Sequence, residues 1–528
     1  MAEPLRETDS VLPDAPVSAP AAPPSQDSLA RHVSVLMLGK TAAVLFTFAL
    51  PLILVRRLAQ VEFGLYKQAF LLISTAIAIL PLGLAMSAFY FLPRVGRDRR
   101  GAVASNILLI YILIGTCTGL LIYLEPSVVV AIFNGPDLVP YAPRIGLALA
   151  LLVAGSFLEY VMIACQDTQY AALFITATQF SKAALLIAAA IWISTIDALL
   201  DAAALQGCLQ LVWVLVYMRR RFGRIVQVDW ALLRAQLAYG FPLGMAALLY
   251  WFQTQLHLYF VAHRFGPAEY AIYAVGCFEL PLMTILSESV ASVLIQRTND
   301  LHSRNQHGEL ASLVVESVRN LSWFYLPLFA FLLLGARDII LLLFTKKYLP
   351  SLPIFIIDCG LIPLMIPSVA CDVLVRAYAS YRFFLLKVRA VLAVALISLM
   401  WLAIAHMGPI GAISVVVVIA AAERTSVSWR LARDLHVLRG QRAVLMDIVR
   451  IAGASAAAAL VTIPVLQAMA GRSPLLVLLA SGTTFSVAYL IFSRPWRMFD
   501  CQGLVVQLGW GRLMWWRRPA SIAASEHS

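Results

Sequence analysis

The sequence predicts an all-α, polytopic membrane protein with about 14 transmembrane helices, arranged as two six-helix lobes and two C-terminal helices. Of its 528 residues, 61% are hydrophobic and 13% are charged, whereas a soluble domain carries roughly 25% charged residues. Apolar runs long enough to cross a bilayer, which takes about 20 residues, recur along the chain. Two parts of the chain also repeat each other. These observations exclude an ordinary soluble protein and leave no stretch long enough for a separate catalytic domain.

The chain begins with a segment, 1–30, that is rich in proline and alanine and contains five acidic residues. Such a composition cannot bury enough apolar surface to fold, so we expect a disordered cytoplasmic tail. The first apolar run starts after Arg31, too late for a cleaved signal peptide, and is expected to remain as an anchor.

Fourteen runs are predicted to span the membrane, and helix boundaries read from sequence alone drift by several residues. The weakest are the runs from 198 and from 409, which contain Asp201 and Glu423; a count of twelve stays open. The predicted spans are 33–55, 67–92, 103–124, 143–165, 170–194, 198–218, 239–261, 270–296, 313–335, 352–375, 384–406, 409–429, 446–469 and 474–492.

The net charge of +12 is interpreted as an orientation signal rather than as a nucleic-acid site. Alternate loops, such as those around Arg94–Arg100 and Arg219–Arg224, are rich in arginine, which is typical of cytoplasmic loops. Both termini are then cytoplasmic and the number of spans is even. The C-terminal segment 494–528 mixes tryptophan with arginine and is predicted to be an interfacial tail. The seven cysteines lack disulfide or metal-ligand spacing, so no metal or cofactor is expected.

An internal repeat is visible after the first and the seventh predicted spans. Arg57–Tyr66 and Arg264–Tyr273 share their Arg, Glu, aromatic and Tyr positions at an offset of 207. A second match follows in order, because the Ile132-Phe133 pair and its two later prolines correspond to the Leu343-Phe344 pair and its prolines. We therefore predict a duplication in which both copies have the same orientation, with a substrate route between the lobes. The predicted lobes are 31–222 and 235–435, and the accessory helices 13 and 14 occupy 445–493.

At these segments the sequence resembles the multidrug/oligosaccharidyl-lipid/polysaccharide exporter superfamily and, within it, the Wzx-like polysaccharide transport proteins. The resemblance is carried by Arg57–Tyr66, by Leu342–Pro350 and by Gly408–Ala412, and it covers roughly residues 31 to 430. It implies a V of two six-helix lobes, and it implies flipping of undecaprenyl-diphosphate-linked oligosaccharides across a bacterial inner membrane. The first span offers only Lys40, where the lipid II flippase branch is expected to carry several arginines.

Cations inside the predicted spans are the first candidates for a substrate site, because a charge near mid-bilayer normally faces a cavity or a partner. Lys182 lies near the middle of its span, with Thr178 and Gln179 one turn before it, and is predicted to hold a diphosphate or sugar hydroxyls. Arg389 lies 207 positions later and is its counterpart in the second lobe. Lys40 is either part of the same site or extends to the cytoplasmic interface. A buried lysine paired with a carboxylate is the alternative for Lys182.

Acidic and aromatic residues supply the remaining candidates. Glu279, Glu288 and Glu159 are candidates for proton or sodium coupling, with a structural hydrogen bond as the alternative; Glu159 also pairs with Lys182 or lines the inner opening of the route. Tyr250, Gln253 and His257 share a face of the seventh span and suit sugar rings, although aromatic residues in spans more often serve packing. The pairs Glu316–Arg319 and Asp372–Arg376 are interpreted as ion pairs within a helix.

The function these features favour is flipping of a lipid-linked oligosaccharide by alternating access, without covalent chemistry. The expected partners are a polyprenyl-diphosphate-linked glycan, the lipid bilayer, and a polysaccharide polymerase with its chain-length regulator, but no nucleic acid. Two alternatives stay open: a proton- or sodium-coupled drug or cation antiporter, and a membrane glycan polymerase or ligase. The enzyme would need a large outer loop with clustered acidic and basic groups, and the longest one, 125–143, contains only Glu125 and Asp137 as acidic residues.

Overall fold

The computed structural model describes most of the chain and shows helices joined by short connections, with no strand among the described residues. The predicted tails 1–30 and 494–528 lie outside this part, as do Lys40, Glu279 and Glu288. The described residues are 48–493 except 224–225, 279, 281–282, 284, 288–289, 292–293, 295–296, 299–306, 378 and 435–441.

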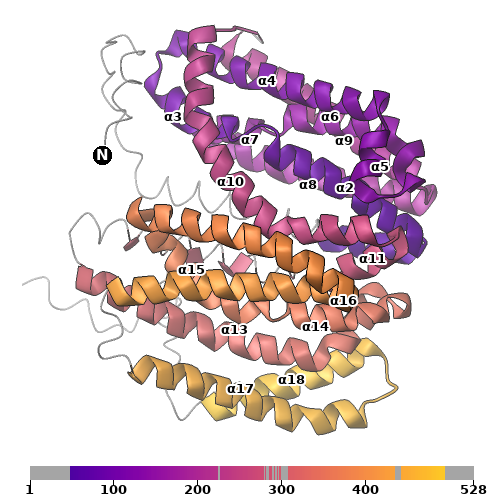
Figure 1. The fold of residues 1–528 in the computed structure, drawn as a ribbon, viewed down its shortest axis with the longest axis vertical. Helices are drawn as coiled ribbons and strands as arrows, with labels where there is room; N and C mark the ends of the chain where they lie inside the picture. The colour runs from indigo at the N-terminus through magenta and orange to yellow at the C-terminus, as the bar shows by residue number, and fades with distance from the viewer. Residues whose placement is uncertain are drawn as a thin grey trace, which may run out of the picture. The chain divides into compact units, whose positions relative to one another are not determined.

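The helices group into two compact units, of which the first contains residues up to Phe278 together with 344–351 and 393–412. In its centre α4, α6 and α9 lie side by side, and α8 packs against α9 (Figure 1). The helices of this unit are α2 (Gln60–Ile79), η2 (Leu84–Met86), α3 (Ser87–Arg94), α4 (Arg97–Leu124), α5 (Ser127–Phe133), η3 (Pro136–Tyr141), α6 (Ala142–Gly155), α7 (Leu158–Ala164), α8 (Thr168–Trp192), α9 (Ile196–Phe222), α10 (Trp230–Arg264), α11 (Pro267–Gly276) and η4 (Lys346–Ser351).

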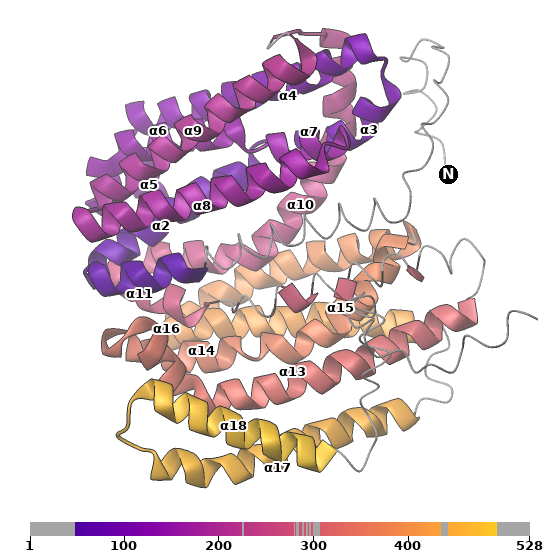
Figure 2. The same ribbon diagram turned by 180° about the vertical axis from the view of Figure 1, so that it is seen from behind.

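The second unit contains the remaining part of the chain, in which α17 and α18 pair along their length (Figure 2). Aromatic residues join this pair to α13, because Tyr489 donates a hydrogen bond to the carbonyl of Trp323 at 2.9 Å. The helices are α13 (His307–Phe344), α14 (Leu352–Asp358), α15 (Leu361–Ala377), α16 (Ala379–Asp434), α17 (Arg442–Ala468) and α18 (Pro474–Ser493). Residues 393–412 of α16 belong to the first unit.

Eleven described helices are long and apolar enough to cross a membrane, and they account for twelve of the fourteen predicted spans. One of them, Phe383–Asp434, contains both the eleventh and the twelfth span, which meet at a kink where Gly408 has φ 60°. The predicted first span and the span 270–296 lie partly outside the described residues. The helix α10, which the sequence places at the start of the second lobe, packs within the first unit. The lobe boundaries 31–222 and 235–435 therefore stay a prediction.

Two predicted spans are broken rather than continuous. The span 67–92 is interrupted after α2, where Leu82 and Gly83 have positive φ angles of 44° and 72°. The span 143–165 is interrupted between α6 and α7. The first break fits against α10, because Gly240 and Gly244 leave room for its backbone: a Cβ on Gly244 would lie 2.2 Å from the carbonyl of Leu82. Glycines four residues apart let helices approach closely in membranes.

The two copies of the repeated segment pack against each other inside the first unit. The helix α2 contains the first copy and α11 the second, and these helices are in contact along their length. Gly64 is essential to this contact, since a Cβ there would lie 1.9 Å from the carbonyl oxygen of Pro267. Phe63, Tyr270 and Tyr273 are fully buried at or beside the interface. The aromatic positions of the repeat are therefore core residues, whereas Arg57 and Arg264 are exposed.

We expect Gly64→Val to destabilise the protein by about 1–3 kcal/mol, the usual cost of forcing extra carbon atoms into a packed core. The measurement is the midpoint of thermal unfolding of the detergent-purified chain. Gly453→Ala is the matched control, because nothing lies within 4 Å of the added Cβ. Equal midpoints for the two variants would show that α2 and α11 do not pack as described.

Candidate functional site

Lys182 places an ammonium group deep inside the span formed by an apolar helix. It lies on α8, about 21 Å along the helix axis from Thr168 and about 15 Å from Trp192. Its side chain is half-buried, and Nζ lies over the ring of Phe70 on α2, 5.9 Å from the ring centroid. Among the described residues, no carboxylate lies within ion-pair distance of Lys182. Within this part of the chain the aromatic ring, and not the alternative partner Glu159, is the neighbour that contacts the ammonium group.

The polar groups next to Lys182 hold α8 against α9. Thr178 donates its hydroxyl to the carbonyl of Phe174 at 2.7 Å, and its own carbonyl accepts a hydrogen bond from Gln206 Nε2 at 3.1 Å. Ser181 donates to Gln206 Oε1 at 2.7 Å. Gln206 is thereby satisfied although it is buried, and these bonds fix the stretch of α8 from which Lys182 extends.

Arg389, the predicted counterpart of Lys182, forms an ion pair in the second unit. Its Nη2 and Nε lie 3.1 and 3.3 Å from Oε1 of Glu423, whose side chain is only 5% exposed. Arg424 Nη1 lies 3.8 Å from the same oxygen. Two guanidinium groups thus share one carboxylate. The two equivalent positions of the repeat differ, because Arg389 has a carboxylate partner and the corresponding lysine has an aromatic ring.

The three residues predicted to form a sugar-binding face on α10 have different environments. Gln253 and His257 are buried, whereas Tyr250 is 46% exposed. His257 Nδ1 lies 2.7 Å from the hydroxyl of Tyr273 on α11, and the two rings meet edge to face. His257 therefore joins α10 to α11 within the packed core, and its predicted contact with a sugar ring stays a prediction.

The structure describes only some of the predicted acidic residues. Glu159 lies half-buried on α7, beside the partly exposed Tyr160, and its coupling role stays a prediction. Glu316 and Arg319 lie one turn apart on α13, and their ion pair also stays a prediction. The side chains of Asp372 and Arg376 are outside the described part.

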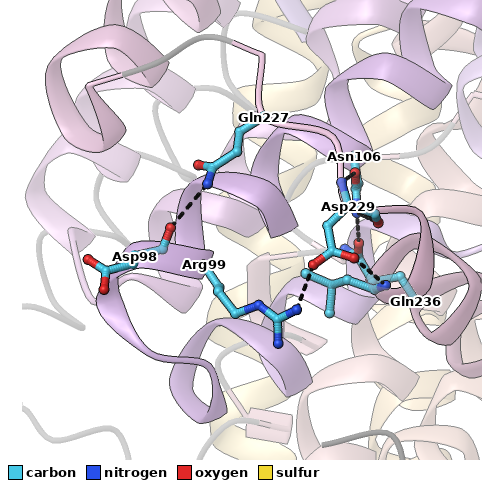
Figure 3. Close-up of polar contacts among 7 residues, drawn as sticks. Asp98, Arg99, Asn106, Gln227, Asp229 and Gln236 are labelled. Carbon is cyan, nitrogen blue, oxygen red and sulfur yellow. Dashed lines mark hydrogen bonds and ion pairs between the residues drawn. The ribbon is translucent and has the colours of Figure 1, made fainter.

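A buried polar network at the start of α10 was not predicted from the sequence (Figure 3). Asn106 Nδ2 donates to the Asp229 carbonyl and to Gln236 Oε1, both at 3.0 Å, and Gln236 donates to Ser87 Oγ at 3.2 Å. The Asp229 carboxylate caps α10 by accepting from the Leu232 N–H at 3.0 Å, and it pairs with Arg99 at 2.9 Å. Asn106 and Gln236 are fully buried. The network fixes the first turns of α10 to α3 and α4.

A second residue that the sequence-based interpretation missed is Lys67. The predicted span began at Lys67, which placed it at the membrane boundary. In the structure α2 begins at Gln60, and Glu62 accepts a hydrogen bond from the Ala59 N–H at 2.9 Å. Lys67 therefore lies in the third turn of the helix. The sequence held only half of the usual signal, since Glu62 occupies the glutamate position of an N-terminal capping box but Ala59 stands where that motif has Ser or Thr.

The fold and the charged residues together define a class: a polytopic α-helical membrane protein with cations placed inside its spans. Among the described residues no cluster of histidine, cysteine or acidic side chains is suited to a metal ion. The chain belongs to the family described as polysaccharide biosynthesis protein, whose sequence profile matches residues 53–353, more than half of its length.

Solved structures of transporters share the fold. The lipid II flippase MurJ, in an inward closed conformation, aligns with a TM-score of 0.67 at 13% identity, over 87% of this chain and 99% of that one. An inward-facing multidrug resistance MATE family transporter aligns with a TM-score of 0.54 at 13% identity, over 77% and 96%. A point mutant of the Vibrio cholerae MATE transporter VcmN aligns with a TM-score of 0.51 at 15% identity, over 77% and 98%. No curated protein sequence matches the chain.

We expect Arg389→Ala to lower the stability of the protein by about 3 kcal/mol, because removing one partner of a buried ion pair leaves an uncompensated charge. Arg424 compensates it only partly at 3.8 Å. The matched control is Arg430→Ala, which removes a pair at 3.6 Å with side chains 43% and 40% exposed and should cost about 1 kcal/mol or less. The check is thermal unfolding in detergent; similar losses for the two variants would contradict the burial of the Arg389–Glu423 pair.

Proposed function

We propose that this protein flips an undecaprenyl-diphosphate-linked oligosaccharide across a bacterial inner membrane by alternating access, for exopolysaccharide, O-antigen or capsule assembly. Membership of the polysaccharide biosynthesis family and the transporter fold support this proposal. MurJ is described as a lipid II flippase, and we infer a similar movement of a lipid-linked substrate for this protein. We infer that the protein is a transporter and not an enzyme.

The single observation that carries the proposal is the position of Lys182. Placing an ammonium group near the centre of a membrane helix costs about 2.5–3.5 kcal/mol, and no described carboxylate offsets that cost. An aromatic ring at 5.9 Å offsets it in part through a cation–π interaction. A cation kept at such a cost suits an anionic substrate, and a diphosphate head group carries the required negative charge.

The remaining candidates complete the substrate route in this proposal. Arg389 and Lys40 add positive charge for the diphosphate, and Tyr250 and Gln253 meet the sugar rings. The head group moves between the two lobes while the polyprenyl tail remains in the bilayer. Glu159, Glu279 and Glu288 are the candidates for a coupling ion.

The cellular setting follows from the same proposal. The chain is a multi-pass protein of the inner membrane with both termini in the cytoplasm, where the oligosaccharide is built. A polysaccharide polymerase and a chain-length regulator then act on the flipped substrate at the outer face.

The alternatives require different chemistry. A drug or cation antiporter needs an acidic site for a cationic substrate, which is the opposite of a lysine held over an aromatic ring. A glycan polymerase or ligase needs clustered acidic and basic groups outside the membrane. In the structure the 125–143 connection is occupied by α5 and η3, and its Glu125 accepts a hydrogen bond from Ser127 at 3.2 Å.

We expect Lys182→Gln to reduce glycan export by about ten-fold or more, since a charge-assisted hydrogen bond is typically worth at least 1.5 kcal/mol. The measurement is surface polysaccharide in cells whose export depends on this chain, normalised to the amount of protein in the membrane. Lys182→Arg keeps the charge and should retain export. Lys346→Gln is the matched control because this lysine is exposed. Unchanged export in Lys182→Gln would contradict the proposed role of the cation.

A further inference from the structure

Lys67 is a second cation buried in the first unit, and neither the expected substrate route nor the comparisons assign it a role. It lies on α2, about 10 Å along the helix axis from Gln60 and about 18 Å from Ile79. Its side chain is half-buried, and Nζ lies over the ring of Phe63, 5.6 Å from the centroid. Lys67 is therefore inside the span and not at its boundary.

Lys67 and Lys182 lie against one aromatic strip of α2, which consists of Phe63, Tyr66 and Phe70. The rings follow one another closely, with centroid separations of 6.1 Å for Phe63–Tyr66 and 4.5 Å for Tyr66–Phe70. Lys67 lies over one end of the strip and Lys182 over the other. Positions 63, 67 and 70 follow at helical spacing and occupy one side of α2. The two ammonium groups thus lie along the same strip of α2 even though they come from different helices.

The charge of this site is not balanced by the part of the chain that the structure describes. Neither lysine lies within ion-pair distance of a described carboxylate, and both are held over aromatic rings. Two like charges near one strip repel each other in a medium of low dielectric constant. An anion bound between them removes both the repulsion and the cost of the missing counter-charges.

We propose that Lys67 and Lys182 form a two-cation site for the diphosphate of a polyprenyl-linked substrate, so that each ammonium group holds one phosphate. The inference rests on the proposed function and specifies how its substrate is recognised. The two phosphates of a diphosphate offer more acceptor oxygens and more negative charge than one phosphate, so a pair of cations selects diphosphate over monophosphate. The half-buried ring of Phe70 supplies an apolar surface beside the first isoprene unit or the first sugar ring.

The orientation of the helices also places the site relative to the two faces of the membrane. With both termini in the cytoplasm, as proposed, α2 runs from the outer to the inner face and α8 runs from the inner to the outer face. Lys67 lies about 10 Å from the outer end of α2, and Lys182 about 15 Å from the outer end of α8. The two-cation site then occupies the outer half of the membrane and receives the head group late in its passage.

The test is equilibrium binding to the purified full-length protein in nanodiscs, with undecaprenyl diphosphate and undecaprenyl monophosphate as probes. Wild type should bind the diphosphate about ten-fold or more tightly than the monophosphate, because the second cation adds a charge-assisted contact. Lys67→Gln should reduce this preference to near unity by weakening diphosphate binding, while Lys67→Arg retains it. Lys346→Gln is the control lysine and should bind as wild type does.

A double-mutant cycle adds a readout that a structural role of Lys67 would not produce. If both lysines hold one diphosphate, the losses of binding free energy in Lys67→Gln and Lys182→Gln should not add up in the double variant. In each single variant the diphosphate is no longer bridged, so the lysine that remains contributes less than it does in the wild type. Lys67→Met, which keeps the length of the side chain and removes the charge, replaces Lys67→Gln if the latter folds poorly. Additive losses would indicate two separate sites and overturn the proposal.

The outcomes separate this inference from the proposed function. Unchanged diphosphate preference in Lys67→Gln, with export still dependent on Lys182, overturns the two-cation site and leaves the flippase proposal standing. A wild-type protein that binds neither probe overturns both.

Discussion

The constraint on which this structure depends is that a charge placed in the hydrocarbon region needs compensation. The protein meets it in two ways. In the second unit Arg389 shares the buried carboxylate of Glu423 with Arg424. In the first unit Lys67 and Lys182 rest on aromatic rings, and no described carboxylate pairs with them. The two positions that the predicted repeat aligns therefore differ in how their charge is compensated: Arg389 has a carboxylate partner, and Lys182 has an aromatic ring.

The scaffold that holds these cations is built from close backbone contacts. Gly64 brings α2 against α11, and Gly244 brings α10 against the broken turn at Leu82. The buried network of Asn106 and Gln236 fixes the first turns of α10 to α3 and α4. Because α2 carries the aromatic strip, its packing positions the rings over which the two ammonium groups lie. The close helix contacts that the glycines allow therefore help to position the aromatic rings beside the two lysines.

Much of the fold could be predicted from the sequence, because long apolar runs and a repeat whose matches follow in order leave few alternatives. The aromatic positions of the repeat, Phe63 and Tyr270, are core residues, but the sequence did not predict that the two segments pack against each other. The breaks at Leu82 and after Gly155 could not be predicted, because they depend on which helix packs against them. The pairing of Arg389 with Glu423, 34 residues apart, depends on how one helix folds back on another. Lys67 was missed because hydropathy marks where a run becomes apolar and not where the helix begins.

Flipping of a lipid-linked oligosaccharide can be measured directly with the purified wild-type protein in liposomes. A fluorescent undecaprenyl-diphosphate-linked oligosaccharide is placed in both leaflets, and its exposure to a membrane-impermeant quencher is followed over time. We expect the protein to accelerate exchange of this lipid between leaflets and to move no cationic drug in exchange for protons or sodium ions. Drug movement driven by a proton or sodium gradient, with no exchange of the lipid-linked oligosaccharide, would contradict the proposed function.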